Sequence, residues 1–319
     1  MNLQQLRYLC AVVDHGLNVS DAAEALFTSQ PGISKQIRQL EDELGLTVFV
    51  RQGKRLAALT PAGEVVVATA RRAMREVANL KRVAEEFRGE DTGTLSIATT
   101  HTQARYTLPK VIGTFMKRYP DVRLSLRQGT PQGCAVMVAL GQADLAICTE
   151  TADEPADVVA VPCYLLKRSV VTPLRHPLTR IRPLTLEALA RFPVITYEDG
   201  FNGRRVVDET FAQAGLAPRV ILSAVDADVS KAYVEMGLGI AILASVAVDP
   251  RRDAGLRRLD ASHLFRPSCL SAMVRRGMYL RRYMTHFIEM FAPHVGAADI
   301  ERALAGGRLD RMRRNLPTL

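Results

Sequence analysis

The chain has 319 residues, of which 48% are hydrophobic and 24% charged, and its formal net charge is +9 at pH 7. This length suits two or three domains whose cores need no metal or disulfide, and no apolar run of about 18 residues predicts a transmembrane helix. The five cysteines are widely spaced and form no CxxC pair, which argues against a zinc site and against a disulfide framework.

The first 45 residues show apolar side chains at helical spacing. They predict one helix over 3–13, a second through 22–26, and a third between Pro31 and Gly45. Two short helices joined by a tight turn form the helix-turn-helix plan, here over about 19–38. A small helical domain with a solvated basic loop is the alternative that this spacing alone leaves open.

The polar face of the third helix carries the residues expected to read DNA. Ser34, Lys35 and Arg38 lie on the side opposite the apolar residues. Hydroxyl groups reach base edges in a major groove, while Lys and Arg reach guanine or phosphate. We therefore predict that this helix enters the major groove of double-stranded DNA.

A hairpin is predicted after the third helix. The short apolar stretches 46–50 and 56–60 flank a basic turn that contains a glycine. Such a hairpin is a wing, and Arg51, Lys54 and Arg55 are expected to contact phosphates at its tip. Residues 1–60 are accordingly predicted to form a winged helix-turn-helix domain.

A long helix is predicted over 61–90, capped by Thr60 and starting at Pro61. Its apolar residues repeat at alternating spacings of four and three, which is typical of a helix that pairs with a second copy. The alternative is a helix that packs on its own domain. The repeat comprises Val66, Ala70, Ala73, Val77, Leu80, Ala84 and Phe87.

From Thr94 onward short apolar strands alternate with amphipathic helices, which predicts a parallel α/β sheet. We expect an effector-binding domain over 91–319 with two halves that the chain crosses twice, as in periplasmic binding proteins. One half covers about 91–162 and 269–295, and the other covers about 163–268. A ligand would bind in the cleft between the halves.

Polar residues follow the predicted strands where ligands bind in such sheets. Thr100, Thr102 and Gln103 follow the first strand, and Thr149 follows the third. Hydroxyls and helix N-termini bind small anions without a full countercharge. Ordinary helix capping is the alternative. His101 has no nucleophile or acid placed to work with it, so we expect neither catalysis nor a metal.

Several sequence strings resemble the LysR-type transcriptional regulators. In the first domain these strings are 22–26, 29–34, 37–41 and 59–63. In the second domain the strings 98–106, 127–132, 226–229 and 233–240 are similar to the CysB-like branch of that family, which controls sulfur assimilation or the use of organic sulfur sources. The likeness extends from residue 1 to about 295.

The resemblance implies residue roles and partners. Ser29 and Gln30 join the DNA contacts, and Thr100, Thr102, Gln103 and Thr149 match the effector pocket of the branch. That pocket takes sulfate, adenosine phosphosulfate or acetylserine-type inducers. The branch usually has threonine where Asn202 stands here; asparagine keeps a donor and an acceptor but is longer, so the exact ligand stays open.

The expected protein is thus a cytoplasmic homodimer or homotetramer that binds an operator and a small anionic effector, with RNA polymerase as a further candidate partner and no membrane contact. The N-terminal residues show no signal-peptide pattern, which supports the cytoplasmic expectation. A LysR-type regulator of unrelated metabolism is the main alternative. A small-anion-binding protein or an enzyme of the same α/β plan is the other.

Overall fold

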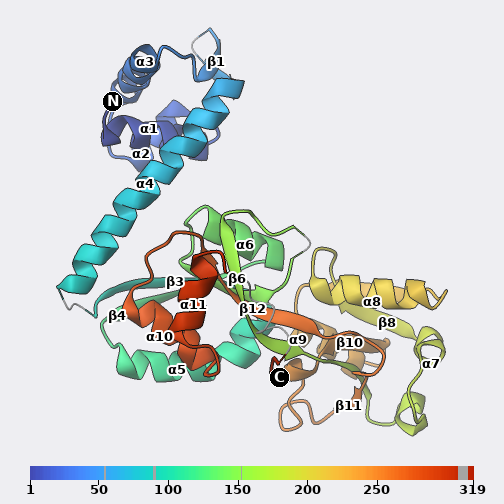
Figure 1. The fold of residues 1–319 in the computed structure, drawn as a ribbon. Helices are drawn as coiled ribbons and strands as arrows, with labels where there is room; N and C mark the ends of the chain where they lie inside the picture. Colours follow the sequence, from blue (N-terminus) through green and yellow to red (C-terminus); the bar gives the residue numbers. More distant parts are fainter. Residues whose placement is uncertain (54, 89–90, 152, 308–314) are drawn as a thin grey trace. The chain divides into compact units, whose positions relative to one another are not determined.

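The computed structural model describes residues 1–53, 55–88, 91–151, 153–307 and 315–319. The chain divides into two units, Met1–Gly89 and Glu90–Leu319 (Figure 1). Each unit is described here by itself.

The first unit is a winged helix-turn-helix followed by a long helix, as predicted. Asn18 caps the second helix, Ser29 caps the third, and Gly45 ends the third in the left-handed conformation with φ 65°. The wing is an antiparallel pair of strands. The elements are α1 (Leu3–Asp14), α2 (Val19–Ala25), α3 (Gln30–Leu44), β1 (Phe49–Gln52), β2 (Arg55–Leu59) and α4 (Pro61–Phe87).

The wing is tied to the start of α4 through Val48. The Thr60 amide donates to the Val48 carbonyl over 2.9 Å, and the Thr60 hydroxyl donates to the Thr47 carbonyl over 2.6 Å. A Cβ atom at Gly63 would lie 2.1 Å from the same Val48 carbonyl oxygen. Only glycine fits at Gly63, which explains the Thr-Pro-Ala-Gly string at this junction.

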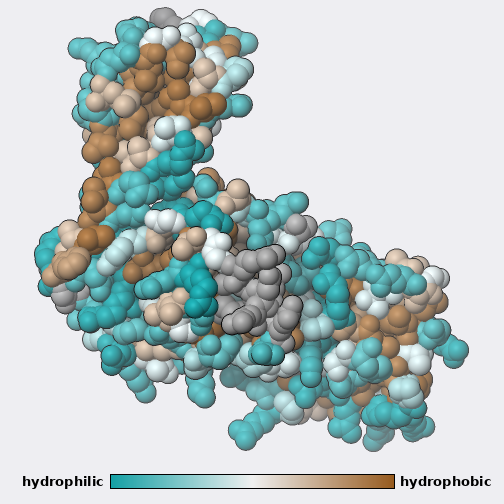
Figure 2. Space-filling view, in the orientation of Figure 1, coloured by the Kyte–Doolittle hydropathy of each residue, from teal (hydrophilic) through white to brown (hydrophobic). Residues whose placement is uncertain are grey.

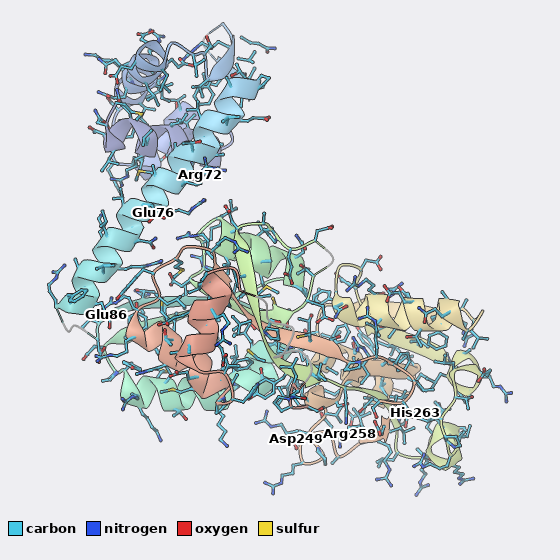
Figure 3. The ribbon with its side chains drawn as sticks, viewed as in Figure 1. Arg72, Glu76, Glu86, Asp249, Arg258 and His263 are labelled. Atoms are coloured by element: carbon cyan, nitrogen blue, oxygen red, sulfur yellow. The ribbon has the colours of Figure 1, made fainter. Side chains whose placement is uncertain are left out.

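The predicted apolar repeat of α4 is divided between two environments. Its N-terminal part, including Ala70 and Ala73, packs against the core that α1, α2 and α3 form. Towards the C-terminal end, Leu80 and Phe87 are 70% and 86% exposed. Figure 3 labels Arg72, Glu76 and Glu86 along the same helix. The alternative of a helix packed on its own domain therefore holds for the first half of α4.

The second unit contains two five-stranded sheets. The first sheet has the strand order β4-β3-β5-β12-β6 and the second has the order β11-β7-β10-β8-β9. Strands β3, β4 and β5 are parallel, whereas β12 runs antiparallel to β5 and β6. The strands are β3 (Gly93–Thr99), β4 (Val122–Gln128), β5 (Leu145–Thr149), β6 (Val158–Leu166), β7 (Arg168–Pro173), β8 (Pro193–Tyr197), β9 (Arg219–Ala224), β10 (Ile240–Ala244), β11 (Leu256–Asp260) and β12 (Ser268–Arg275).

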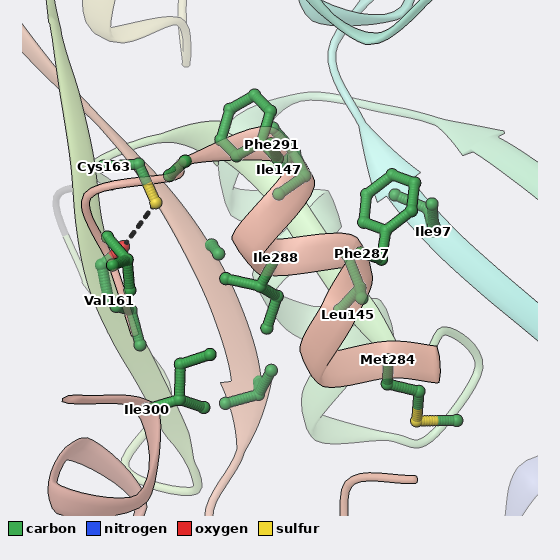
Figure 4. Packing of buried hydrophobic residues seen from close by; sticks show 14 of the residues in the cluster. Ile97, Leu145, Ile147, Val161, Cys163, Met284, Phe287, Ile288, Phe291 and Ile300 are labelled. Carbon is green, nitrogen blue, oxygen red and sulfur yellow. Dashed lines mark hydrogen bonds between the residues drawn. The ribbon is translucent and has the colours of Figure 1, made fainter. Parts of the chain in front are cut away.

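Helices cover both faces of each sheet, so central strands such as β5 and β10 are continuous apolar runs. The first sheet packs on α5, α10 and α11 through a core that includes Phe115, and on α6 from the other side. Figure 4 shows Phe287 and Ile300 in this core. In the second sheet α8 and α9 cover opposite faces. The remaining elements are η1 (Gln103–Thr107), α5 (Leu108–Arg118), α6 (Pro131–Ala139), η2 (Pro177–Arg180), α7 (Leu186–Ala190), α8 (Asn202–Gln213), α9 (Ala227–Glu235), η3 (Ser245–Ala247), α10 (Arg282–Phe291) and α11 (Ala297–Leu304).

The chain crosses from the first sheet to the second at Lys167, between β6 and β7, and returns between β11 and β12. The first crossing comes later than the expected boundary at 162/163. The reason is that residues 158–172 form an almost continuous apolar stretch in which two strands of different sheets follow each other without a turn signal.

The chain's last residues return to β6. The Leu165 amide donates to the Pro317 carbonyl over 2.9 Å, and the Leu319 amide donates to the Leu165 carbonyl over 3.0 Å. The basic residues between, Arg308, Arg311, Arg313 and Arg314, lie outside the described part of the chain.

Candidate DNA-binding face and effector cavity

The predicted DNA-reading residues gather in one groove of the first unit. The groove runs between α3 and the wing, and Gln30, Ser34, Lys35, Arg38 and Arg51 all line it. Lys35 and Arg38 are exposed and form no ion pair with the described residues. An exposed groove with unpaired cations suits a polyanionic duplex.

Two of the other residues predicted to contact DNA also form hydrogen bonds within α3. Ser29 accepts from the Gly32 amide over 3.3 Å as the cap of α3, and it is exposed. Gln30 donates to the Ser34 hydroxyl over 3.2 Å, so both lie on one polar face of α3.

The wing residues differ in how free they are. The Arg51 guanidinium donates to the Glu41 carboxylate over 2.8 Å, while the same carboxylate accepts from the Val48 amide over 2.8 Å. Glu41 thus links the wing to α3, and the ion pair with Arg51 is part of that link. Arg55 is exposed and lines a neighbouring groove. Lys54 lies outside the described residues.

All five predicted effector residues line a single cavity in the second unit. Thr100, Thr102 and Gln103 follow β3, Thr149 ends β5, and Asn202 begins α8. The cavity lies at the carboxyl ends of these strands and beside both crossings of the chain, where α/β folds bind ligands. Residues from both sheets therefore meet around it.

The groups that face the cavity are mainly hydrogen-bond donors. The Gln103 amide oxygen accepts from the Thr107 hydroxyl over 3.3 Å, which leaves its nitrogen for a ligand. The Tyr197 hydroxyl is buried and has no hydrogen-bond partner among the described residues. Burial raises the pKa of Tyr197, so this hydroxyl keeps its proton at neutral pH.

A buried cation, Arg168, lines the same cavity and is only 4% exposed. Its guanidinium donates to the Arg266 carbonyl over 2.8 Å and to the Ser268 hydroxyl over 2.6 Å, and no carboxylate of the described residues pairs with it. Burial lowers the pKa of Arg168 to about 10, so the side chain stays charged at neutral pH. A buried charge that forms no ion pair is costly, and a bound anion would offset that cost.

Sequence reasoning missed Arg168, Ser268 and Tyr197. The signal for Arg168 is present, because Lys167 and Arg168 are two consecutive cations inside an otherwise apolar stretch. Ser268 and Tyr197 have no comparable signal, since a lone serine or tyrosine next to a strand is common.

A second polar cluster joins the two sheets beside the cavity. The buried Lys231 ammonium of α9 contacts both Asp253 carboxylate oxygens, at 2.9 and 3.0 Å, and the Tyr106 hydroxyl at 2.9 Å. Tyr106 also donates to Asp228, the carboxylate that His101 faces with its Nε2 3.7 Å from Oδ2. Tyr106 belongs to the segment that carries Thr102 and Gln103, so this cluster ties the cavity wall to α9. His101 itself does not line the cavity.

Other features bear on the class of protein. No group of three or more His, Cys, Asp or Glu side chains in the described ranges is arranged to hold a metal ion. A separate finding is that, over the same ranges, no helix has both the length and the apolar character to cross a bilayer.

Comparison with known proteins covers nearly the whole chain. The family described as bacterial regulatory helix-turn-helix protein, lysR family, matches residues 3–64, and the LysR substrate binding domain matches residues 88–296. The HTH-type transcriptional regulator SsuR of Burkholderia cenocepacia is 50% identical over 300 residues, covering 94% of this chain and 97% of that protein. The regulator CysB of the same organism is 46% identical over 306 residues, covering 96% of this chain and 98% of that protein.

A solved structure agrees with these sequences. The crystal structure of the cofactor-binding domain of the Cbl transcriptional regulator is 43% identical and superposes with a TM-score of 0.64, covering 67% of this chain and 93% of that one. The predicted resemblance to the CysB-like branch is therefore confirmed. The chain belongs to the LysR family of bacterial regulatory helix-turn-helix proteins.

Proposed function

We propose that this LysR-family transcriptional regulator controls genes of sulfur metabolism and that a small sulfur-containing anion such as sulfate switches it. One observation carries the proposal. Residues from both sheets, Thr100, Thr102, Gln103, Thr149 and Asn202, line one cavity that also holds a buried cation with no ion pair to a carboxylate of the described residues. Its relatives SsuR and CysB belong to the CysB-like branch, and the resemblance of this chain to that branch implies control by sulfur compounds.

The size of the cavity favours a small effector. It leaves about 40 Å³ for the centres of water-sized molecules, which is room for about three waters at roughly 10–15 Å³ each. A tetrahedral oxyanion fits this space. The adenosine group of adenosine phosphosulfate and the longer chain of acetylserine would extend beyond it.

The position of the cavity suggests how the switch works. An anion held between residues of both sheets binds one relative arrangement of the two halves more tightly than others, so it shifts the population towards that arrangement. We assign DNA reading to 1–60, dimerisation and linkage to 61–90, and effector sensing to 91–319. The binding energy at the cavity would then change the geometry with which two DNA-reading domains meet an operator.

We also infer that the chain assembles as a homodimer or homotetramer through α4. The exposed Leu80 and Phe87 are the observation behind this inference, and Figure 2 shows hydrophobic side chains along this helix. Light scattering of the whole chain at micromolar concentration should give a mass of two or four times 35.1 kDa. Glutamate at both positions should yield monomers. A wild-type monomer at that concentration would contradict the inference.

The remaining partners follow from this role. We infer a cytoplasmic location from action on DNA, and the relatives SsuR and CysB are named as transcriptional regulators. We propose no catalytic activity, since no histidine or carboxylate of the described residues lines the cavity to act as a general base. RNA polymerase is the partner through which an activator of this family would act.

Replacing Thr102 with alanine should weaken binding of sulfate about ten- to hundredfold, because one hydroxyl donor to a charged ligand is lost. Calorimetric titration of the whole protein with sodium sulfate measures this change. Thr114→Ala is the matched control, since Thr114 is an exposed residue of α5 whose hydroxyl bonds to the Lys110 carbonyl. Equal sulfate affinity for Thr102→Ala and the wild type would sink the assignment of the cavity.

A further inference from the structure

The hydrogen bonds of the Ser268 hydroxyl leave it able only to donate a hydrogen bond towards the cavity. It accepts from the Arg168 guanidinium over 2.6 Å and from the Asn202 amide nitrogen over 2.9 Å. Both partners can only donate through these atoms, and a hydroxyl oxygen has two lone pairs. Ser268 is therefore saturated as an acceptor, and its single proton remains to donate.

The orientation of Asn202 is set by Arg205. The Arg205 guanidinium donates to the Asn202 side-chain oxygen over 2.9 Å. Because a guanidinium has no acceptor, the amide oxygen must face Arg205 and the amide nitrogen must face Ser268. Asn202 is only 4% exposed, so the arrangement is held in a packed site. Asn202 consequently acts on the ligand through Ser268.

Ser268 is placed to use its proton on a ligand. It is 2% exposed and lines the effector cavity at the start of β12. The donor-rich wall described above continues around it, with the Gln103 nitrogen, the Tyr197 hydroxyl and the charge of Arg168. No carboxylate of the described residues lines this cavity. The carboxylate beside it, Glu150, has its pKa raised by burial, and one of its oxygens is buried without a partner.

We propose that the acceptor-saturated Ser268 makes the cavity select oxyanions that carry no proton and reject those that do, with Asn202 and Arg205 as the positioning residues for this selection. The inference rests on the proposed anion-binding function. Sulfate and thiosulfate carry no proton near neutral pH. Inorganic phosphate keeps at least one, and where its P–OH group points at Ser268 or Arg168 neither side chain can accept that proton. A buried polar group left without a partner is what makes such a site discriminate.

The test is calorimetric titration of the whole protein in Tris chloride with sodium sulfate, thiosulfate and phosphate. Wild type should bind sulfate and thiosulfate at least about tenfold more tightly than phosphate. Asn202→Ala frees one lone pair of Ser268, so the ratio of sulfate to phosphate affinity should fall about tenfold. Ser268→Ala removes the donor and should lower sulfate affinity about tenfold with little change for phosphate.

The conservative variant Asn202→Thr separates positioning from simple disruption. A threonine hydroxyl can still donate to Ser268, so this variant should keep most of the wild-type sulfate to phosphate ratio. A variant that merely loosened the cavity would weaken both anions together and leave the ratio unchanged.

The outcomes are distinct. If the wild type binds none of the three anions, the proposed function fails and this inference fails with it. If it binds sulfate and phosphate equally, or if Asn202→Ala and Ser268→Ala leave the ratio at the wild-type value, only the selection mechanism is overturned. Preference for sulfate that is lost in Asn202→Ala and kept in Asn202→Thr supports it.

Discussion

Replacing Lys35 and Arg38 together with alanine is expected to lower the affinity for specific DNA about 30- to 20,000-fold. Both side chains are exposed on α3, line the groove beside the wing, and have no ion pair with the described residues. A good contact to a base edge contributes about 1–3 kcal/mol, and two such contacts contribute roughly 2–6 kcal/mol. Neither residue packs in the core, so the stability of the first unit should hardly change.

The measurement is a gel-shift titration with a duplex selected from a random pool by the wild-type chain. The control is Lys117→Ala with Arg123→Ala, which removes the same charge from exposed positions of the second unit. Salt dependence refines the assignment, since each lost phosphate contact reduces the slope of log affinity against log salt by about 0.9. Affinity within twofold of the wild type would remove α3 from its role as recognition helix.

Local signals were sufficient to predict the first unit. Asn18 and Gly45 mark a helix start and a helix end through their own backbone chemistry, whatever packs against them. The wing shows where this reasoning stops. From the sequence, Arg51 is expected to be an unpaired basic residue, yet its guanidinium forms an ion pair with Glu41 of the preceding helix. A contact between two elements depends on how they pack, which spacing within one element does not specify.

The effector cavity could be predicted only in part, again because contacts between elements depend on how they pack. Thr100 and Thr149 follow apolar strands directly, so their place at a sheet edge follows from the strand pattern. Ser268 reaches the cavity only because β12 returns to the first sheet beside the crossing at Lys167. The link between Tyr106 and Lys231 spans 125 residues, and no local pattern reports such a pairing.

Replacing Lys231 with methionine is expected to lower the free energy of unfolding of the second unit by about 3–5 kcal/mol. Lys231 is 6% exposed, and its ammonium contacts Asp253, Tyr106, the Ala247 carbonyl over 2.9 Å and Asp228 over 3.1 Å. Burial alone would lower the pKa of Lys231, but hydrogen bonds to Tyr106, Asp253 and Asp228 outweigh it and raise that pKa, so the charge is well satisfied. Methionine fills a similar volume and leaves the largely buried Asp253 carboxylate without its counterion.

Urea unfolding of the whole chain, followed by far-ultraviolet circular dichroism, measures this loss. Adding Asp253→Asn to Lys231→Met removes the stranded charge, so the double variant should be more stable than Lys231→Met alone, with a coupling of roughly 0.5–3 kcal/mol. Lys117→Met, at an exposed position of α5, should change stability by less than about 0.5 kcal/mol. If Lys231→Met were no less stable than Lys117→Met, the contacts between η1 and α9 would not hold the two sheets together. Those contacts belong to the segment that carries Thr102 and Gln103. A stable Lys231→Met protein would therefore also argue against these contacts as the physical link that couples an anion in the cavity to α9.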